Sequence, residues 1–161
     1  MELYILRHGI AADGEAGQPD SGRTLTPEGR KKLRAMLQSA AAAGVAPSLI
    51  LTSPYKRAVQ TAQLAAAALG YGGELLRTNA LVPGSTPQAV WEEVRVHRDQ
   101  RQILLSGHEP LLSATAGFLL GCPSMGIEFK KGTMARIDLD RFGPAPRGVL
   151  KWLLAPKLGG A

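Results

Sequence analysis

LYILRHG, at residues 3–9, is the stretch of sequence that most narrows the possible folds. Its short apolar run is typical of a strand buried in the middle of a parallel sheet. The run stops at Arg7 and His8, and Gly9 can let the chain turn away at once. Open α/β sheets bind their ligands beyond the carboxyl ends of their strands, so we expect Arg7 and His8 to lie at a binding site.

Two more apolar runs end close to residues that could serve chemistry. Residues 48–52 lead toward Arg57, and residues 102–106 lead almost directly into His108. The carboxyl ends of parallel strands meet at one rim, so we expect these two side chains to join those of the first strand.

Hydroxyl residues followed by proline are typical helix starts, and they occur at Thr26-Pro27, Ser53-Pro54 and Thr86-Pro87. Helices are expected at residues 27–44, 54–69, 87–97 and 110–120. Strands are expected at residues 3–6, 48–52, 74–77, 102–106, 135–140 and 149–154. This order predicts an α/β fold: a three-layer α/β/α sandwich with a mostly parallel central sheet and antiparallel edge strands. One domain is expected over residues 1–161, with residues 159–161 as a tail.

Composition limits the classes of partner. The net charge is +6, from 19 Lys and Arg against 13 Asp and Glu, which favours an anionic ligand. The basic residues are scattered rather than clustered, so nucleic acid is not expected as a partner. There is no run long enough to span a membrane and no pattern of a signal peptide. Cys122 is the single cysteine, which fits a reducing, cytoplasmic location.

The expected rim carries two arginines, two histidines and two helix N-termini, a combination suited to a phosphoryl group. No Gly-rich phosphate loop with lysine is present. Ligands for a metal are sparse, because the histidines form no helical pair and Cys122 stands alone. We therefore expect no metal and no cofactor. A side chain should be the nucleophile, and the neutral nitrogen of His8 can attack phosphorus to form a phosphohistidine.

These segments together resemble the histidine phosphatase superfamily. The resemblance covers the whole chain and rests on RHG at 7–9, RTLTPEG at 23–29, SPYKRAVQT at 53–61 and GHEP at 107–110. The short chain and the segment at 23–29 resemble the SixA-type phosphohistidine phosphatases. The resemblance implies a phosphoglycerate mutase-like fold with His8 as the phosphorylated nucleophile. It also implies a phosphate pocket completed by Arg7, Arg57 and His108, with Arg23 nearby as a further substrate-binding residue.

The sequence departs from the larger members of that superfamily, many of which carry a glutamate general acid beneath a helical roof. The corresponding stretch here, NALVPGS at 79–85, has no carboxylate, and residues 70–101 are too few to build a large lid. We expect a shallow, open site. The favoured function is a metal-independent phosphohistidine phosphatase that acts on a phosphorylated protein. The alternatives are a phosphomonoesterase for a small metabolite and, from a different class, a non-catalytic module that binds phosphate.

Several other polar residues are interpreted as structural. Asp13 and Glu109 are candidates for positioning water or a proton, but a carboxylate such as Glu109 is favourable at a helix start in any case. His97 is expected on the surface of its helix. Thr52 and Ser53 are interpreted as turn and cap residues. The sequence leaves the oligomeric state open.

Overall fold

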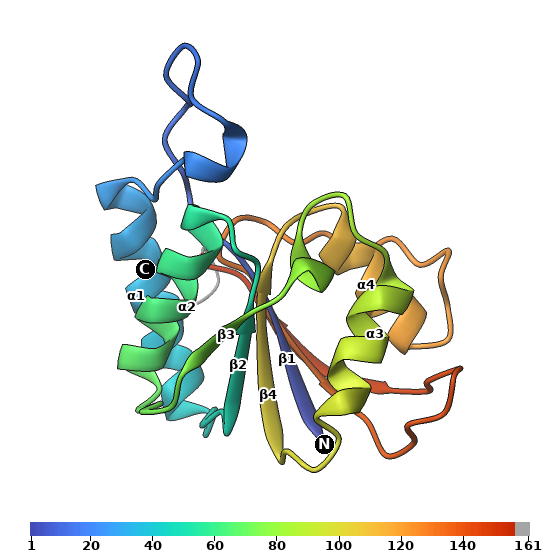
Figure 1. The fold of residues 1–161 in the computed structure, drawn as a ribbon. Coiled ribbons are helices and arrows are strands. Elements are labelled where there is room, and N and C mark those ends of the chain that lie inside the picture. The colour runs from blue at the N-terminus through green and yellow to red at the C-terminus, as the bar shows by residue number, and fades with distance from the viewer. Residues whose placement is uncertain (157–161) are drawn as a thin grey trace.

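The computed structural model describes residues 1–156 and contains one mixed six-stranded sheet, with strand order β3-β2-β4-β1-β5-β6 (Figure 1). The first four strands in this order run parallel, whereas β5 is antiparallel to β1 and β6 is antiparallel to β5. The strands are β1 (Glu2–Arg7), β2 (Leu49–Thr52), β3 (Leu75–Arg77), β4 (Gln102–Gly107), β5 (Met134–Asp138) and β6 (Val149–Leu154). The prediction of a mostly parallel sheet with antiparallel strands at one edge is confirmed.

Helices cover both faces of this sheet (Figure 1). The elements are η1 (Asp20–Gly22), α1 (Pro27–Ala42), α2 (Lys56–Ala68), η2 (Asn79–Leu81), α3 (Pro87–Val96) and α4 (Leu111–Leu119). Leu3 and Ile5 of β1 pack into a core with α3 and α4, and Tyr4 and Leu6 pack into a second core with α1 and α2. Because β1 contributes alternate side chains to two cores, it is buried on both faces. The three-layer α/β/α prediction is confirmed.

Two of the three predicted helix caps are present. The Thr26 hydroxyl accepts from the Gly29 amide at the start of α1, and the Thr86 hydroxyl accepts from the Ala89 amide at the start of α3. The third is wrong. Helix α2 begins at Lys56 rather than at residue 54, and Ser53 is fully buried with its hydroxyl bound to a histidine ring instead.

The exit of the chain from β1 depends on a close approach rather than on an unusual backbone angle. Gly9 does not have a positive φ, but an added Cβ there would lie 3.3 Å from the Leu25 side chain and 3.4 Å from the Gly29 carbonyl oxygen. The close approach lies at Gly29, where an added Cβ would collide with the carbonyl oxygen of Ile10 and lie 2.9 Å from its amide nitrogen. The first turn of α1 therefore packs directly against the backbone that follows the strand.

No helix within residues 1–156 is long and apolar enough to cross a bilayer. The tail expected at residues 159–161 lies outside the described residues.

We predict that Gly29→Ala destabilises the fold. Alanine normally stabilises a helix relative to glycine, but here its methyl group would displace the backbone of Ile10. The free energy of unfolding in urea should fall by about 2 kcal/mol, the usual range for overpacking. Gly72→Ala is the matched control, because a Cβ there meets nothing within 4 Å and φ is not positive. A Gly29→Ala protein as stable as this control would contradict the close packing.

Candidate active site

The carboxyl ends of three adjacent parallel strands bring the predicted site residues together at one rim of the sheet (Figure 1). Arg7 lies opposite Gly107 in the register of β1 and β4, so His8 and His108 follow side by side, with ring centroids 5.1 Å apart. Arg57 lies in the first turn of α2, and its Nε is 3.2 Å from Nε2 of His8. The structure thus places Arg7, His8, Arg57 and His108 around one point.

His8 is held as a neutral ring with one nitrogen free of a proton. Its Nδ1 lies 2.7 Å from the Gly9 carbonyl oxygen, which can only accept, so Nδ1 carries the hydrogen. Nε2 then has a lone pair, toward which Arg57 Nε donates. Burial lowers the pKa of His8 to about 4, and the positive charges of Arg57, Arg7 and Lys131 lower it further. The hydrogen bond to Gly9 acts in the opposite direction and raises this pKa. A neutral Nε2 beside guanidinium groups is a nucleophile for an electrophilic anion.

His108 is oriented by Ser53, a contact that the sequence did not reveal. The Ser53 hydroxyl lies 2.8 Å from Nε2 of His108 and also accepts from the Tyr55 amide. Nδ1 of His108 is buried and has no hydrogen-bond partner in the described part of the chain. Burial, followed by the neighbouring His8 and Arg57, lowers the pKa of His108 to about 3. The ring is therefore neutral, and its Nδ1 can donate in the tautomer in which Nε2 accepts from the Ser53 hydroxyl.

Arg7 presents a second unpaired donor. Its terminal nitrogen donates to the Phe129 carbonyl at 2.6 Å, while its buried Nε has no partner among residues 1–156. Buried donors without partners are costly unless a ligand satisfies them. Together with His108, Arg7 gives the rim donors suited to an anion.

Asp20 is the second residue that sequence reasoning missed. The guanidinium of Arg57 donates to the Asp20 carbonyl at 2.8 Å and to Asp20 Oδ2 at 2.9 Å, and Arg23 donates to Oδ1 at 3.1 Å. Arg23 also donates to the Ala12 carbonyl, so it ties down the loop that carries Asp20 and does not contact His8 directly. The hydrogen bond from Arg57 is the main cause that lowers the pKa of Asp20, so this carboxylate is ionised at neutral pH.

The site is more closed than the sequence predicts. Only 7% of His8, 5% of Arg57 and 1% of His108 is exposed. The reason is the loop before α1, whose short helix η1 lies against α2 and places Asp20 on Arg57. A cavity of about 290 Å³ reaches this region through Arg7, next to Lys32, Lys130 and Lys131.

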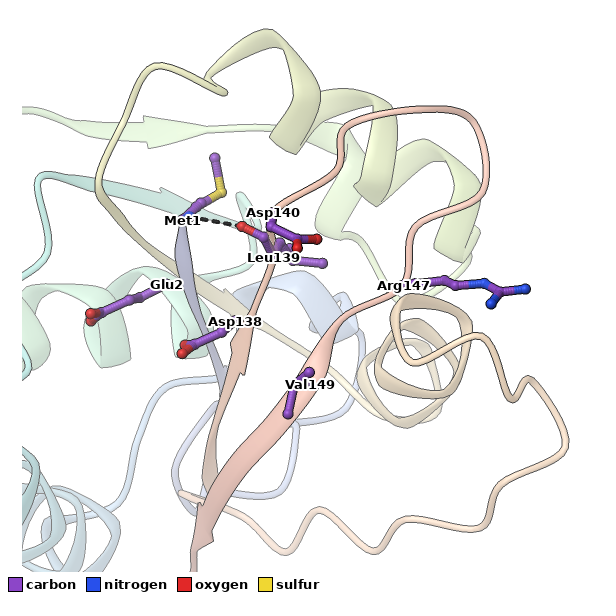
Figure 2. Close-up of a pocket in the computed structure, with 7 residues that line it drawn as sticks. All are labelled: Met1, Glu2, Asp138, Leu139, Asp140, Arg147 and Val149. Carbon is purple, nitrogen blue, oxygen red and sulfur yellow. Dashed lines mark hydrogen bonds between the residues drawn. The ribbon is translucent and has the colours of Figure 1, made fainter.

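The cavity in Figure 2 is a different one, at the amino end of β1, where the amino group of Met1 donates to the Leu139 carbonyl.

The remaining candidates lie elsewhere or have structural contacts. Glu109 accepts from the Ser113 amide in the first turn of α4, which supports its structural interpretation. Asp13 is exposed on the loop before α1, and His97 pairs with Glu93 at the end of α3. Among the described residues, no three His, Cys, Asp or Glu side chains lie close enough together to hold a metal ion.

Comparison with known proteins identifies the family. Residues 3–81 match the histidine phosphatase superfamily (branch 1). An uncharacterised protein of Picosynechococcus sp. is 38% identical over 119 residues, which cover 72% of this chain and 71% of the relative. The solved structure of the protein histidine phosphatase SixA complexed with tungstate is 26% identical, with a TM-score of 0.87 over 98% of each chain.

Structures of lower identity share the fold. A SixA structure from Agrobacterium tumefaciens has a TM-score of 0.83 at 24% identity and covers 96% of this chain and 97% of its own. The alpha-ribazole phosphatase of Shigella flexneri has a TM-score of 0.73 at 18% identity and covers 97% of each chain. The chain belongs to the histidine phosphatase superfamily, which confirms the resemblance and supports phosphatase activity. Within that superfamily it is of the SixA type.

We predict that the His8 imidazole titrates near pH 4 rather than near its usual value of about 6.5. The folded pKa lies below the unfolded one, so the unfolded chain binds this proton first as the pH falls. The contribution of His8 to the free energy of unfolding therefore declines between about pH 6.5 and about pH 4. Imidazole signals in ¹H–¹⁵N NMR spectra, assigned with His8→Ala and His97→Gln variants, measure the midpoint. A His8 midpoint near 6.5 would show that the ring is solvated and not buried beside Arg57.

Proposed function

We propose that the protein is a metal-independent phosphohistidine phosphatase that removes the phosphoryl group from a histidine of another protein. The observation that carries the proposal is the state of His8, whose Nε2 carries a lone pair and no proton because Nδ1 donates to Gly9. Nε2 attacks phosphorus and forms a new N–P bond. The N–P bond of the substrate breaks, its electron pair stays on the leaving imidazole nitrogen, and water then hydrolyses the phosphorylated His8.

The neighbouring donors stabilise the phosphoryl group during transfer. Arg57 and Arg7 supply positive charge, and the unpaired N–H groups of Arg7 and His108 can donate to phosphoryl oxygens. The hydrogen bond from Nδ1 of His8 to Gly9 stabilises the charge that the ring acquires when Nε2 bonds to phosphorus. Two guanidinium groups can supply charge compensation that a metal ion provides in other phosphatases, so the chemistry needs no metal. Arg23 acts indirectly, through Asp20.

A phosphohistidine substrate suits the absence of a proton donor. An alkoxide leaving group needs a positioned acid, but Asp20 is ionised by its bond to Arg57 and Glu109 is committed to its helix start. An imidazole can leave neutral once its second ring nitrogen is protonated from solvent. Between α2 and β4 the chain forms β3, η2 and α3, and α3 packs beside α4 rather than over the rim (Figure 1). The similarity to SixA structures supports the same substrate class.

We predict that kcat/KM for a phosphohistidine peptide exceeds that for glycerol phosphate by at least about a hundredfold, since loss of a general acid typically costs 10²–10⁴-fold. The rates should be unchanged by a chelator. Phosphate release, measured with and without EDTA, tests both statements, and His8→Ala should release none from either substrate while remaining folded.

Equal efficiency on the alkyl phosphate would favour the alternative, a phosphomonoesterase for a small metabolite. Loss of activity in EDTA would contradict metal independence. Substantial turnover by folded His8→Ala would mean that water attacks the substrate directly.

A further inference from the structure

We propose that the Asp20 carboxylate determines specificity: it favours a phosphohistidine substrate whose ring is protonated on its second nitrogen, and it disfavours phosphate esters that carry a second anion. The inference rests on the proposed function, because it concerns the leaving group of the same reaction. Asp20 lies in the loop before α1, and the attack of His8 on phosphorus does not itself require this residue. The inference gives Asp20 a role in the choice of substrate.

Asp20 is placed where it can act on the substrate. Its side chain is 55% exposed, whereas that of Arg57 is 6% exposed, so the carboxylate lies on the solvent side of the Arg57 guanidinium. Every nitrogen of Arg57 is engaged: Nε with His8, one terminal nitrogen with the Asp20 carbonyl and the other with Oδ2. Burial lowers the pKa of His108, and the charge of the Asp20 carboxylate acts against this lowering, so its field also reaches His108.

Two electrostatic consequences follow from this position. An entering phosphoryl group must share Arg57 with Asp20, whose main-chain carbonyl accepts from one terminal nitrogen and whose carboxylate accepts from the other, so the carboxylate weakens the binding of anions. A second anion on the substrate, such as the carboxylate of 3-phosphoglycerate, would meet the same negative charge. A unit charge a few ångströms away is worth tenfold or more in affinity at the effective dielectric constant of a protein surface.

The opposite holds for phosphohistidine. When its second ring nitrogen is protonated, the substrate ring is a cation, and this is the form from which the imidazole departs neutral. The carboxylate of Asp20 attracts that cation and increases the fraction of bound substrate whose ring is protonated. Asp20 thus favours one leaving group by attraction and rejects anionic metabolites by repulsion, the two means by which a site gains selectivity.

Asp20→Asn is the direct test, because it removes the charge and keeps an oxygen that can accept from Arg57. We expect kcat/KM for a phosphohistidine peptide, relative to p-nitrophenyl phosphate, to fall at least about tenfold. The inhibition constants of inorganic phosphate and of 3-phosphoglycerate should also fall, the latter by at least about tenfold. Asp20→Glu restores the charge and should keep the preference of the wild type. Glu15→Gln is the matched control, an exposed charge on the same loop with no ion pair among the described residues.

The outcomes separate this inference from the proposed function. If Asp20→Asn lowers both rates by the same factor and leaves the inhibition constants unchanged, Asp20 merely positions Arg57 and the inference is overturned. If Asp20→Asn binds both anions more tightly and loses the relative preference, the inference stands. If the wild type shows no preference for phosphohistidine, the proposed function fails. Even if the proposed function fails in this way, the inhibition constants still test the repulsion of anions by Asp20. Unchanged constants for inorganic phosphate and 3-phosphoglycerate in Asp20→Asn would overturn that repulsion, and lowered constants would uphold it.

Discussion

The hydrogen bond between Nδ1 of His8 and the Gly9 carbonyl is the interaction on which the site depends. It forms where the chain leaves β1, just before the backbone of Ile10 packs against Gly29 of α1. A carbonyl oxygen can only accept, so the bond fixes which nitrogen of the ring holds the hydrogen. Nε2 then has a lone pair, which accepts a hydrogen bond from Arg57. The fold thereby sets the chemical state of one ring through the path of a few backbone atoms.

The rim buries two histidines and Arg57 and partly buries Arg7, and the surroundings decide which of these side chains carry charge. Burial disfavours the cationic form of both rings, and the guanidinium of Arg57 adds repulsion, so the histidines are neutral while the arginines keep their charge. This division assigns different work to the two residue types: the neutral ring of His8 can attack, and the arginines can hold an anion. Nε of Arg7 and Nδ1 of His108 have no hydrogen-bond partner among the described residues, a cost that a bound phosphoryl group would relieve.

The strands and the positions of His8, Arg57 and His108 could be predicted from the sequence, because short local patterns indicate them. The apolar runs give the strands, and residues that follow directly after strands must meet at a rim; this placed His8 and His108 together. Arg57 was located by its position in the first turn of a helix. Their roles remain predictions, whereas the fold and the family are confirmed.

The contacts that were missed are made across the fold. Ser53 looks like a helix cap in sequence, and only the pairing of β2 with β4 shows that its hydroxyl faces His108. Asp20 lies in a polar loop without periodicity, so nothing local indicates that the loop folds back onto α2 and partly closes the site.

Trapping the phosphorylated enzyme is the most direct test of His8 as the nucleophile. The protein would be mixed with a phosphohistidine peptide, quenched rapidly in alkali to preserve an N–P bond, digested and analysed by mass spectrometry. Phosphate on the peptide that contains His8, formed and lost at rates compatible with turnover and absent from His8→Ala, is the expected result. Turnover with phosphate on another residue, or with no phosphorylated enzyme at any time point, would contradict attack by His8.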